Sequence, residues 1–176
     1  MTEITARLST ALADRCTIDP EIGRAERTVP QKEEENMSTD PMHEDLLNRI
    51  LRTFETCDAD ATAALYETDA VYHQYPEVFH GRDAVRDSMA AWFTAFPDVR
   101  WELQNLMSSG DTFIAEGIFK GTHTGPMKTD QGEIPATGKA VALPCCFIGR
   151  VSSNGLVAED RTYLNAAMMM EQLGLA

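Results

Sequence analysis

Positive charge is scarce in this chain. Lysine and arginine number 15 against 28 aspartates and glutamates, which gives a formal net charge of −13 at pH 7. Nucleic acids and anionic membranes bind positive surfaces, so this balance argues against both as partners. Long apolar runs are also missing, since no segment approaches the roughly 20 residues that span a bilayer, and the amino terminus lacks the basic-then-apolar order of a signal peptide. We therefore expect a soluble, cytoplasmic protein.

Metal-binding patterns are equally sparse. The four cysteines, Cys16, Cys57, Cys145 and Cys146, are not spaced as a zinc site or as a disulfide framework. Adjacent Cys145 and Cys146 would point to opposite faces of a strand, so a bond between them would be strained. The histidines lack the His-x-x-x-His spacing with a nearby carboxylate that is typical of metal enzymes. We expect reduced thiols and no metal.

Length and composition fit one domain preceded by an arm. A chain of 176 residues with 43% hydrophobic content can bury one substantial core. Residues 1–41 are mostly polar and are interrupted by proline, as in Thr17-Ile18-Asp19-Pro20. Because such a segment cannot bury much apolar surface, we expect a flexible arm there and the folded domain at residues 42–176.

Three helices are predicted in the first half of the domain. Apolar residues recur at helical spacing from Leu46 to Phe54, a short second helix is expected from Ala59 to Tyr66, and a third opens at Gly81 and stops before Pro97. Strand patterns dominate the rest. The expected strands are Ala70 to Tyr75, Val99 to Met107, Thr112 to Gly121, Lys139 to Val151 and Leu156 to Leu164, with a long loop from Thr122 to Thr137. Helices followed by an antiparallel sheet indicate an α+β fold.

Short motifs in the last third of the chain follow one another in a recognisable order. They are Gly121-Thr122-His123-Thr124-Gly125, Pro135-Ala136-Thr137-Gly138-Lys139, Arg150-Val151, Asn154-Gly155, Glu159-Asp160-Arg161 and Glu171-Gln172-Leu173-Gly174. In this order and spacing the chain resembles the SnoaL-like polyketide cyclases, also called ester cyclases, of the nuclear transport factor 2-like superfamily, from about Met42 to Leu175. The resemblance implies a cone, in which a strongly curved antiparallel sheet wraps around helices and encloses a ligand pocket.

The two-residue period of a strand decides which side chains could face that pocket. One face of the last strand carries Asp160 and Thr162, with apolar residues before and after them. When the Arg-Val and Asn-Gly motifs are aligned with the family, Cys145 and Phe147 of the preceding strand share the concave side with them. We therefore expect Cys145, Phe147, Asp160 and Thr162 to line the pocket.

The catalytic pair of the family is displaced in this chain. Cyclases of the family use a carboxylate with a nearby histidine, because aldol ring closure needs one proton removed beside a carbonyl and another delivered to an oxygen. The resemblance places that aspartate on Thr162 and that histidine on Phe147. Asp160 lies one step along the same face and could replace the acid, since burial would raise its pKa. The alternative is a satisfied polar residue that pairs with a helix or with His73.

Other candidates surround the expected pocket. His73 is expected at the pocket mouth as a base or hydrogen-bond donor, next to Tyr72, and a structural histidine is the alternative. Trp92, Phe96 and Trp101 could stack on a flat ligand, although aromatic residues at such spacing also build cores.

Three classes of function remain open. The first is a cofactor-free acid-base enzyme that cyclises or isomerises an apolar, polyketide-like carbonyl compound, and the second is a protein that binds a small hydrophobic molecule without chemistry. The third is a dimeric scaffold that pairs through the outer sheet face with Glu159, Arg161, Tyr163 and Glu116. We expect the first, in a homodimer, because the resemblance includes cyclases and Asp160 offers a replacement acid.

Overall fold

The computed structural model describes residues 39–129 and 132–176, and most of the arm expected at residues 1–41 lies outside this part of the chain. Helix α2 begins at Pro41, and the side chain of Asp40 caps it by accepting a hydrogen bond from the backbone N–H of Met42 at 2.8 Å. The backbone N–H of Asp40 also donates to Ser108 Oγ at 2.7 Å. Residues 39–41, which the sequence assigns to the arm, are therefore attached to the folded domain.

The helices of the first half are α2 (Pro41–Thr56), α3 (Ala59–Ala63) and α4 (Arg82–Ala95). The apolar side predicted for the first of them is the side that α2 buries, with Leu46 and Leu47 almost fully enclosed. The second is shorter than expected, because α3 ends at Ala63 and Tyr66 already begins a strand. No helix in the described residues is long and apolar enough to span a membrane.

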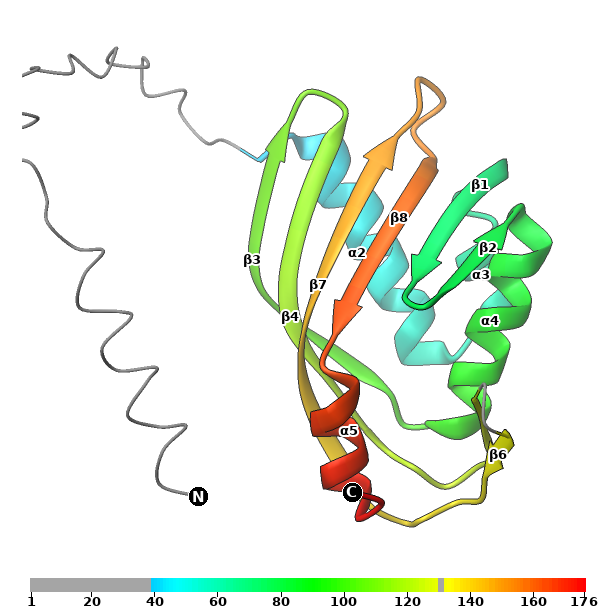
Figure 1. Ribbon diagram of the computed structural model, residues 1–176. Helices are drawn as coiled ribbons and strands as arrows, with labels where there is room; N and C mark the ends of the chain where they lie inside the picture. The colour runs from blue at the N-terminus through cyan, green and yellow to red at the C-terminus, as the bar shows by residue number, and fades with distance from the viewer. Residues whose placement is uncertain (1–38, 130–131) are drawn as a thin grey trace, which may run out of the picture. The chain divides into compact units, whose positions relative to one another are not determined.

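The strands form one large sheet and a small hairpin. They are β1 (Tyr66–Gln74), β2 (Glu77–His80), β3 (Arg100–Ser109), β4 (Thr112–Thr122), β5 (Met127–Thr129), β6 (Gly132–Ile134), β7 (Ala140–Val151) and β8 (Val157–Leu164). The sheet has the order β2-β1-β8-β7-β4-β3, and β5 pairs with β6. Every pairing is antiparallel except that of β1 with β8, which is parallel. The first and last long strands of the domain therefore lie side by side (Figure 1).

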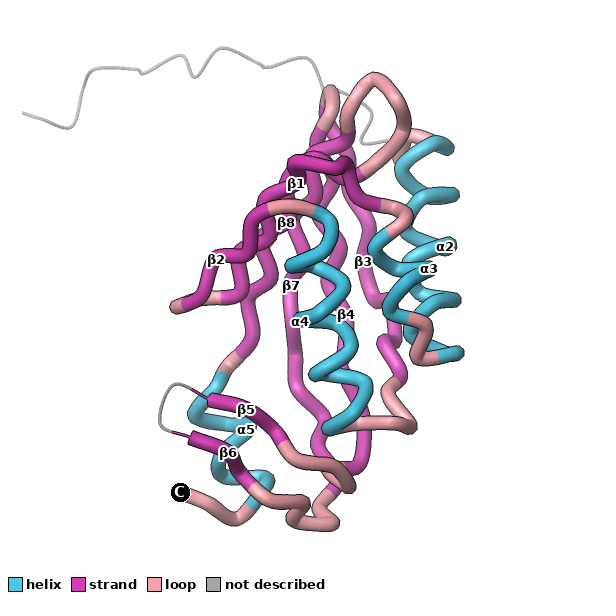
Figure 2. Tube along the Cα trace, turned by 90° about the vertical axis from the view of Figure 1, so that its right-hand side faces the viewer, coloured by secondary structure: helices cyan, strands magenta, loops and turns pink. Residues whose placement is uncertain are grey.

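The helices pack against one face of this sheet. Helix α2 passes behind the strands in Figure 1, and α4 lies across the same face in the side view of Figure 2. Along β4 the residues that face the helices are enclosed, as Phe113, Ala115 and Phe119 show. The expected α+β fold is confirmed, with one apolar core between the helices and the inner face of the sheet.

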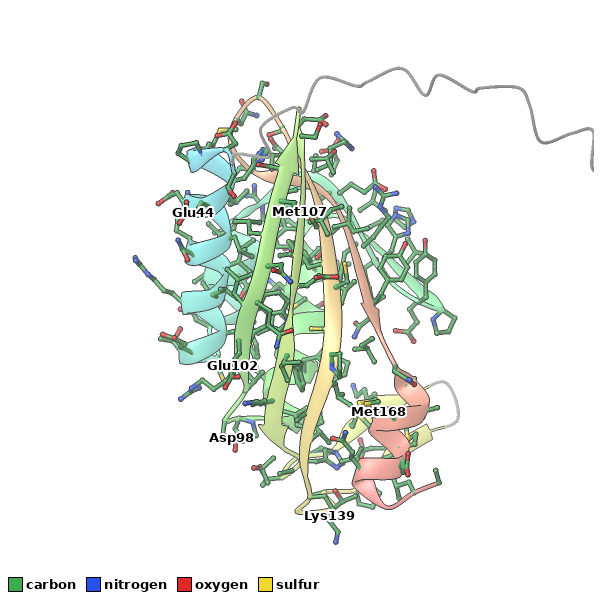
Figure 3. All side chains as sticks on the ribbon, turned by 90° about the vertical axis from the view of Figure 1, so that its left-hand side faces the viewer. Glu44, Asp98, Glu102, Met107, Lys139 and Met168 are labelled. Carbon is green, nitrogen blue, oxygen red and sulfur yellow. The ribbon has the colours of Figure 1, made fainter. Side chains whose placement is uncertain are left out.

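Three short strands are absent from the sequence-based prediction. Strand β2 follows β1 directly, and the expected loop from Thr122 to Thr137 holds the β5–β6 hairpin. Strands of three or four residues are too short to show an alternating pattern, so only pairing reveals them. The chain continues into helix α5 (Ala166–Leu173), which lies at the lower end of the sheet, where Figure 3 labels Met168.

Candidate functional site

A cavity of about 80 Å³ lies between the helices and the inner face of the sheet. Drug-sized ligands occupy pockets of about 300–1,000 Å³, so this cavity suits a small molecule. Its walls come from α2, α4 and strands of both halves of the sheet. The lining residues are Leu47, Ile50, Leu51, Phe54, Tyr66, Tyr72, Gln74, Met89, Trp92, Phe93, Val99, Trp101, Phe119, Cys145, Cys146, Phe147, Asp160, Thr162 and Leu164.

Asp160 is the carboxylate of this cavity. It lies on β8 beside Tyr72 of β1, and its side chain is 1% exposed. The hydroxyl of Tyr66 donates a hydrogen bond to Asp160 Oδ2 at 2.8 Å, and the hydroxyl of Thr162 donates to Oδ1 at 3.1 Å. The alternative partners considered from the sequence, a helix or His73, are not the ones that the structure records. Both oxygens of the buried carboxyl group are thus satisfied by hydroxyl groups on the sheet.

Burial has the largest effect on the pKa of Asp160. Removal from water raises the pKa of Asp160 to about 8, although the hydrogen bonds from Tyr66 and Thr162 act in the opposite direction. Burial and the nearby Asp160 charge also raise the pKa of Tyr66 and of Tyr72 well above the usual value for tyrosine. At neutral pH the site therefore holds a mostly protonated carboxyl group among protonated phenols, with Asp160 the first of these three groups to ionise.

Most of the binding residues expected from the sequence line the cavity. They are Tyr72, Trp92, Trp101, Cys145, Phe147 and Thr162. On β7 and β8, Phe147 lies opposite Thr162 and Cys145 opposite Leu164, so these four residues share one face of the sheet. The thiol of Cys145 accepts a hydrogen bond from the indole N–H of Trp101 at 2.6 Å, and burial raises the pKa of this thiol. A raised pKa disfavours the thiolate that nucleophilic chemistry requires.

The expectation that His73 faces the pocket is wrong. His73 lies between Tyr72 and Gln74 on β1, and these two neighbours line the cavity, so the alternation of the strand turns His73 to the other face. There its Nε2 lies 3.5 Å from Glu159 Oε1. His73 therefore does not meet Asp160, and it cannot act as the base of this cavity.

Phe96 also lies outside the cavity lining. It is fully buried at the carboxyl end of α4, where its ring stacks on Trp92 with centroids 5.7 Å apart and meets the edge of Phe119 at 5.4 Å. It also contacts the buried ring of His123 at 5.3 Å. Phe96 supports the cavity wall from behind, because Trp92 and Phe119 are themselves lining residues.

Tyr66 is the site residue that the sequence reasoning missed. The sequence pattern predicts Tyr66 at the end of a helix, whereas Tyr66 is the first residue of β1. It lies 94 positions before its hydrogen-bond partner Asp160 in the chain. The signal was present in the alternation of Tyr66, Ala70 and Tyr72, all of which are buried. Gln74 continues the same face and also lines the cavity.

The outer face of the same strands is polar and aromatic. Glu159 lies within ion-pair distance of His73, Arg150 and Arg161. Tyr163 is 44% exposed and its ring contacts that of Tyr75. The homodimer expected through this face stays a prediction.

The residues that could hold a metal do not gather in the described part of the chain. Among residues 39–129 and 132–176, no group of three or more histidine, cysteine, aspartate or glutamate side chains is arranged to bind a metal ion. The polar part of the cavity instead includes one carboxyl group, the amide of Gln74 and hydroxyl groups, which suit hydrogen bonding to an oxygen atom of a ligand.

Known proteins resemble this chain in fold. The structure of TsrD from Streptomyces laurentii has a TM-score of 0.68 and 21% identity, and the match covers 79% of this chain and 100% of TsrD. A proposed SnoaL-like polyketide cyclase from Jannaschia sp. CCS1 has a TM-score of 0.65 at 16% identity, covering 79% of this chain and 98% of its own. A ketosteroid isomerase-like protein from Catenulispora acidiphila DSM 44928, in complex with trimethylamine, has a TM-score of 0.63 at 16% identity, with 75% and 94% covered.

Comparison of the sequence with protein-family models identifies the family of this chain. No curated protein matches the chain, but residues 44–173 match the model of the SnoaL-like polyketide cyclase family. That range runs from the first turn of α2 to the end of α5, so it contains every element that lines the cavity. The chain therefore belongs to the SnoaL-like polyketide cyclase family and has its nuclear transport factor 2-like fold.

Proposed function

We propose that this protein is a cofactor-free acid-base enzyme that cyclises or isomerises a small apolar carbonyl compound. The observation that carries the proposal is the buried Asp160, the one carboxyl group among the described residues that line the cavity. A group whose pKa lies close to the working pH can both take and return a proton. The apolar walls and the modest volume favour a small substrate with few charges.

The chemistry needs two proton transfers. At pH 7 about a tenth of a carboxyl group with a pKa of about 8 is ionised, and this carboxylate takes a proton from the carbon beside a carbonyl. The electron pair left on that carbon forms an enolate, which attacks a second carbonyl carbon of the same molecule and makes the new carbon–carbon bond. The oxygen of the attacked carbonyl takes the proton from Asp160. In an isomerisation, the proton returns to another carbon instead.

Two hydroxyl groups hold the carboxyl group for this task. Tyr66 donates to Oδ2 and Thr162 to Oδ1, so both stabilise the charge that remains when the proton leaves. The hydroxyl of Tyr72 belongs to the same wall of the cavity and is the candidate donor to the carbonyl oxygen of the substrate. Each residue acts through hydrogen bonding alone, and the overall reaction neither gains nor loses electrons.

Proton abstraction can be tested before the natural substrate is known. Cyclopentanone dissolved in D₂O exchanges the hydrogens beside its carbonyl slowly, and NMR measures the rate. We expect the protein to accelerate this exchange and Asp160→Asn to lower the acceleration by about a hundredfold, the usual scale for a general base. The acceleration should rise with pH and level off above about 8, because the carboxylate is the active form.

Glu159→Gln is the matched control, since it removes a carboxylate from the neighbouring position on the outer face of β8. This variant should keep the exchange rate of the unmodified protein. Equal rates in Asp160→Asn and in the unmodified protein would remove Asp160 from the chemistry.

A protein that binds a small hydrophobic molecule without chemistry is the second candidate. It is favoured by Phe147 and Thr162, which occupy the positions where the resemblance places the histidine and the aspartate of the family cyclases. Such a protein would bind cyclopentanone, as changes in the fluorescence of Trp92 and Trp101 would report, without accelerating the exchange. Both tryptophans line the cavity, so binding and chemistry are measured separately.

A further inference from the structure

The cavity has a polar end and an apolar end. Asp160 lies opposite Gly149 of β7, and Cys145 lies four residues earlier on the same strand. At about 3.3 Å per strand residue, the two levels are about 13 Å apart. The hydroxyl groups gather at the level of Asp160, whereas the side chains of Trp101 and Leu164 line the cavity at the level of Cys145.

Trp101 reaches the apolar end by crossing a strand. It belongs to β3, yet its indole N–H donates to the sulfur of Cys145 on β7, and β4 runs between these two strands. The residue of β4 paired with Cys145 is Gly117. A Cβ atom at Gly117 would lie only 2.9 Å from Cζ3 and Cη2 of the indole. The ring can therefore lie across the strand only because this position carries no side chain.

The second tryptophan of the lining is held differently. Trp92 stacks on Phe96 at 5.7 Å and meets the edge of Phe119 at 5.6 Å, so it is part of an aromatic cluster anchored in the core. Trp101 lies on the edge strand β3, and both tryptophans are partly exposed. The position of the Trp101 ring depends on one hydrogen bond to a thiol and on the space above a glycine.

We propose that Trp101 determines the size of the ligand that the cavity accepts, and that Cys145 and Gly117 position its ring for this purpose. With the indole across β4, a ligand whose oxygen binds at Asp160 has room for an apolar body of about one ring. Without the indole, the same oxygen contact leaves room for a fused two-ring body. This inference rests on the proposed function only in placing the ligand oxygen at the polar end.

The test compares two saturated ketones, cyclopentanone with one ring and 2-decalone with two. Dissociation constants are measured by ligand-detected NMR for the unmodified protein, Trp101→Ala and the control Tyr163→Ala, which removes an aromatic ring from the outer face of β8. The unmodified protein should prefer cyclopentanone. Trp101→Ala should shift the ratio of the two constants toward 2-decalone by at least about tenfold, since even one added methylene changes binding in an apolar pocket by this amount. Tyr163→Ala should not produce this shift, because Tyr163 lies outside the cavity lining.

Trp101→Phe provides a milder variant that keeps an apolar ring, and it should give a smaller shift in the same direction. An unchanged ratio in Trp101→Ala and Trp101→Phe would overturn this proposal and leave the proposed function standing. A shifted ratio without accelerated exchange of cyclopentanone would overturn only the enzymatic function. Failure of both ketones to bind the unmodified protein and the variants would overturn both proposals.

The contact with Cys145 has a separate readout. A thiol in contact with an indole quenches its fluorescence, and in a Trp92→Phe background Trp101 is the sole emitter because the chain has two tryptophans. Cys145→Ala should raise the emission in this background and weaken the preference for cyclopentanone. Cys146→Ala is the matched control, because Cys146 is the neighbouring residue of β7 and pairs with Tyr163. Equal emission in the two variants would show that Cys145 does not position the indole.

Discussion

The two ends of the cavity are built in opposite ways. At the polar end the main feature is a set of hydrogen bonds, since the hydroxyl groups of Tyr66 and Thr162 donate to the two oxygens of Asp160. At the apolar end the main feature is a missing group, because the indole of Trp101 lies where Gly117 has no side chain. At one end, burial and two opposing hydrogen bonds set the pKa of Asp160, and at the other end the shape of the wall sets the space for a ligand.

This difference means that acidity and size can be changed independently. The two ends are separated by about 13 Å along β7, and the hydrogen bonds of one end include no residue of the other. Burial and then the charges of Asp160 and Cys145 raise the pKa of Tyr72, which is therefore a neighbour of both ends. Variants that leave Tyr72 in place should have nearly additive effects. Variants at the polar end should therefore change pH profiles, and variants at the apolar end should change ligand preference.

The largest expected effect is on the pH dependence of stability. The pKa of Asp160 is raised in the folded state to about 8, so the folded protein holds a proton that the unfolded chain loses above about pH 4. The free energy of unfolding should fall as pH rises from about 4 to about 8, by up to about 1.4 kcal/mol per pH unit from this group. Asp160→Asn should lose this component, as urea unfolding at pH 5 and pH 9 would measure. Identical pH profiles for the two proteins would show that Asp160 is ionised in the folded state.

The next effect concerns Tyr66→Phe, which removes one donor to the carboxyl group. Because the hydrogen bond from Tyr66 lowers the pKa of Asp160, its loss should move the midpoint of the exchange profile to higher pH. The variant should also lose about 1 kcal/mol of stability, typical for one hydrogen bond. Tyr163→Phe, on the outer face, is the control and should leave the midpoint in place. A midpoint that moves to lower pH would contradict the assignment.

Thr162→Val should act in the same direction and less strongly. Its hydrogen bond to Asp160 is longer, at 3.1 Å against 2.8 Å for Tyr66, and longer bonds are weaker. The variant keeps the shape of the side chain while it removes the hydroxyl. Exchange of cyclopentanone followed against pH should show a smaller upward shift than in Tyr66→Phe, and a larger shift would reverse the proposed ranking of the two donors.

The smallest effect on acidity is expected from the apolar end. Cys145→Ser should leave the midpoint of the exchange profile unchanged within about 0.2 pH units, because burial, Tyr66 and Thr162 account for the shifted pKa of Asp160. The same variant should change the ratio of dissociation constants for cyclopentanone and 2-decalone by less than Trp101→Ala does, because serine still accepts a hydrogen bond from the indole. A shifted midpoint would show that the two ends are coupled.

The sequence predicts the polar end only in part. The alternation of a strand is a local property, so the shared face of Asp160 and Thr162 could be derived without any structure. The same rule places Tyr72 and His73 on opposite faces of the strand, so the two cannot both face the pocket. The alanine-rich residues 59–64 extend a helical pattern up to Tyr66, and this pattern hides the place of Tyr66 in the cavity because the chain turns into β1 there.

The apolar end was harder to predict. Trp101 was recognised as a candidate for stacking, but its contact with Cys145 depends on the register of β3, β4 and β7 together. A glycine in a strand signals close approach by another group without saying which one. The fold class needed only the order of the helices and strands, which survives errors of a few residues at the ends of elements.

The parallel pairing of β1 with β8 determines when the site can exist. Tyr66 and Asp160 are separated by 94 positions, and β1 has only β2 beside it until β8 has been synthesised. During synthesis one edge of β1 remains unpaired, and closing so long a loop slows assembly. A nascent chain that stops before Val157 has neither the carboxyl group nor the strand that carries it. The proposed proton transfer therefore requires a chain that extends through β8, and a fragment that ends before Val157 cannot perform it.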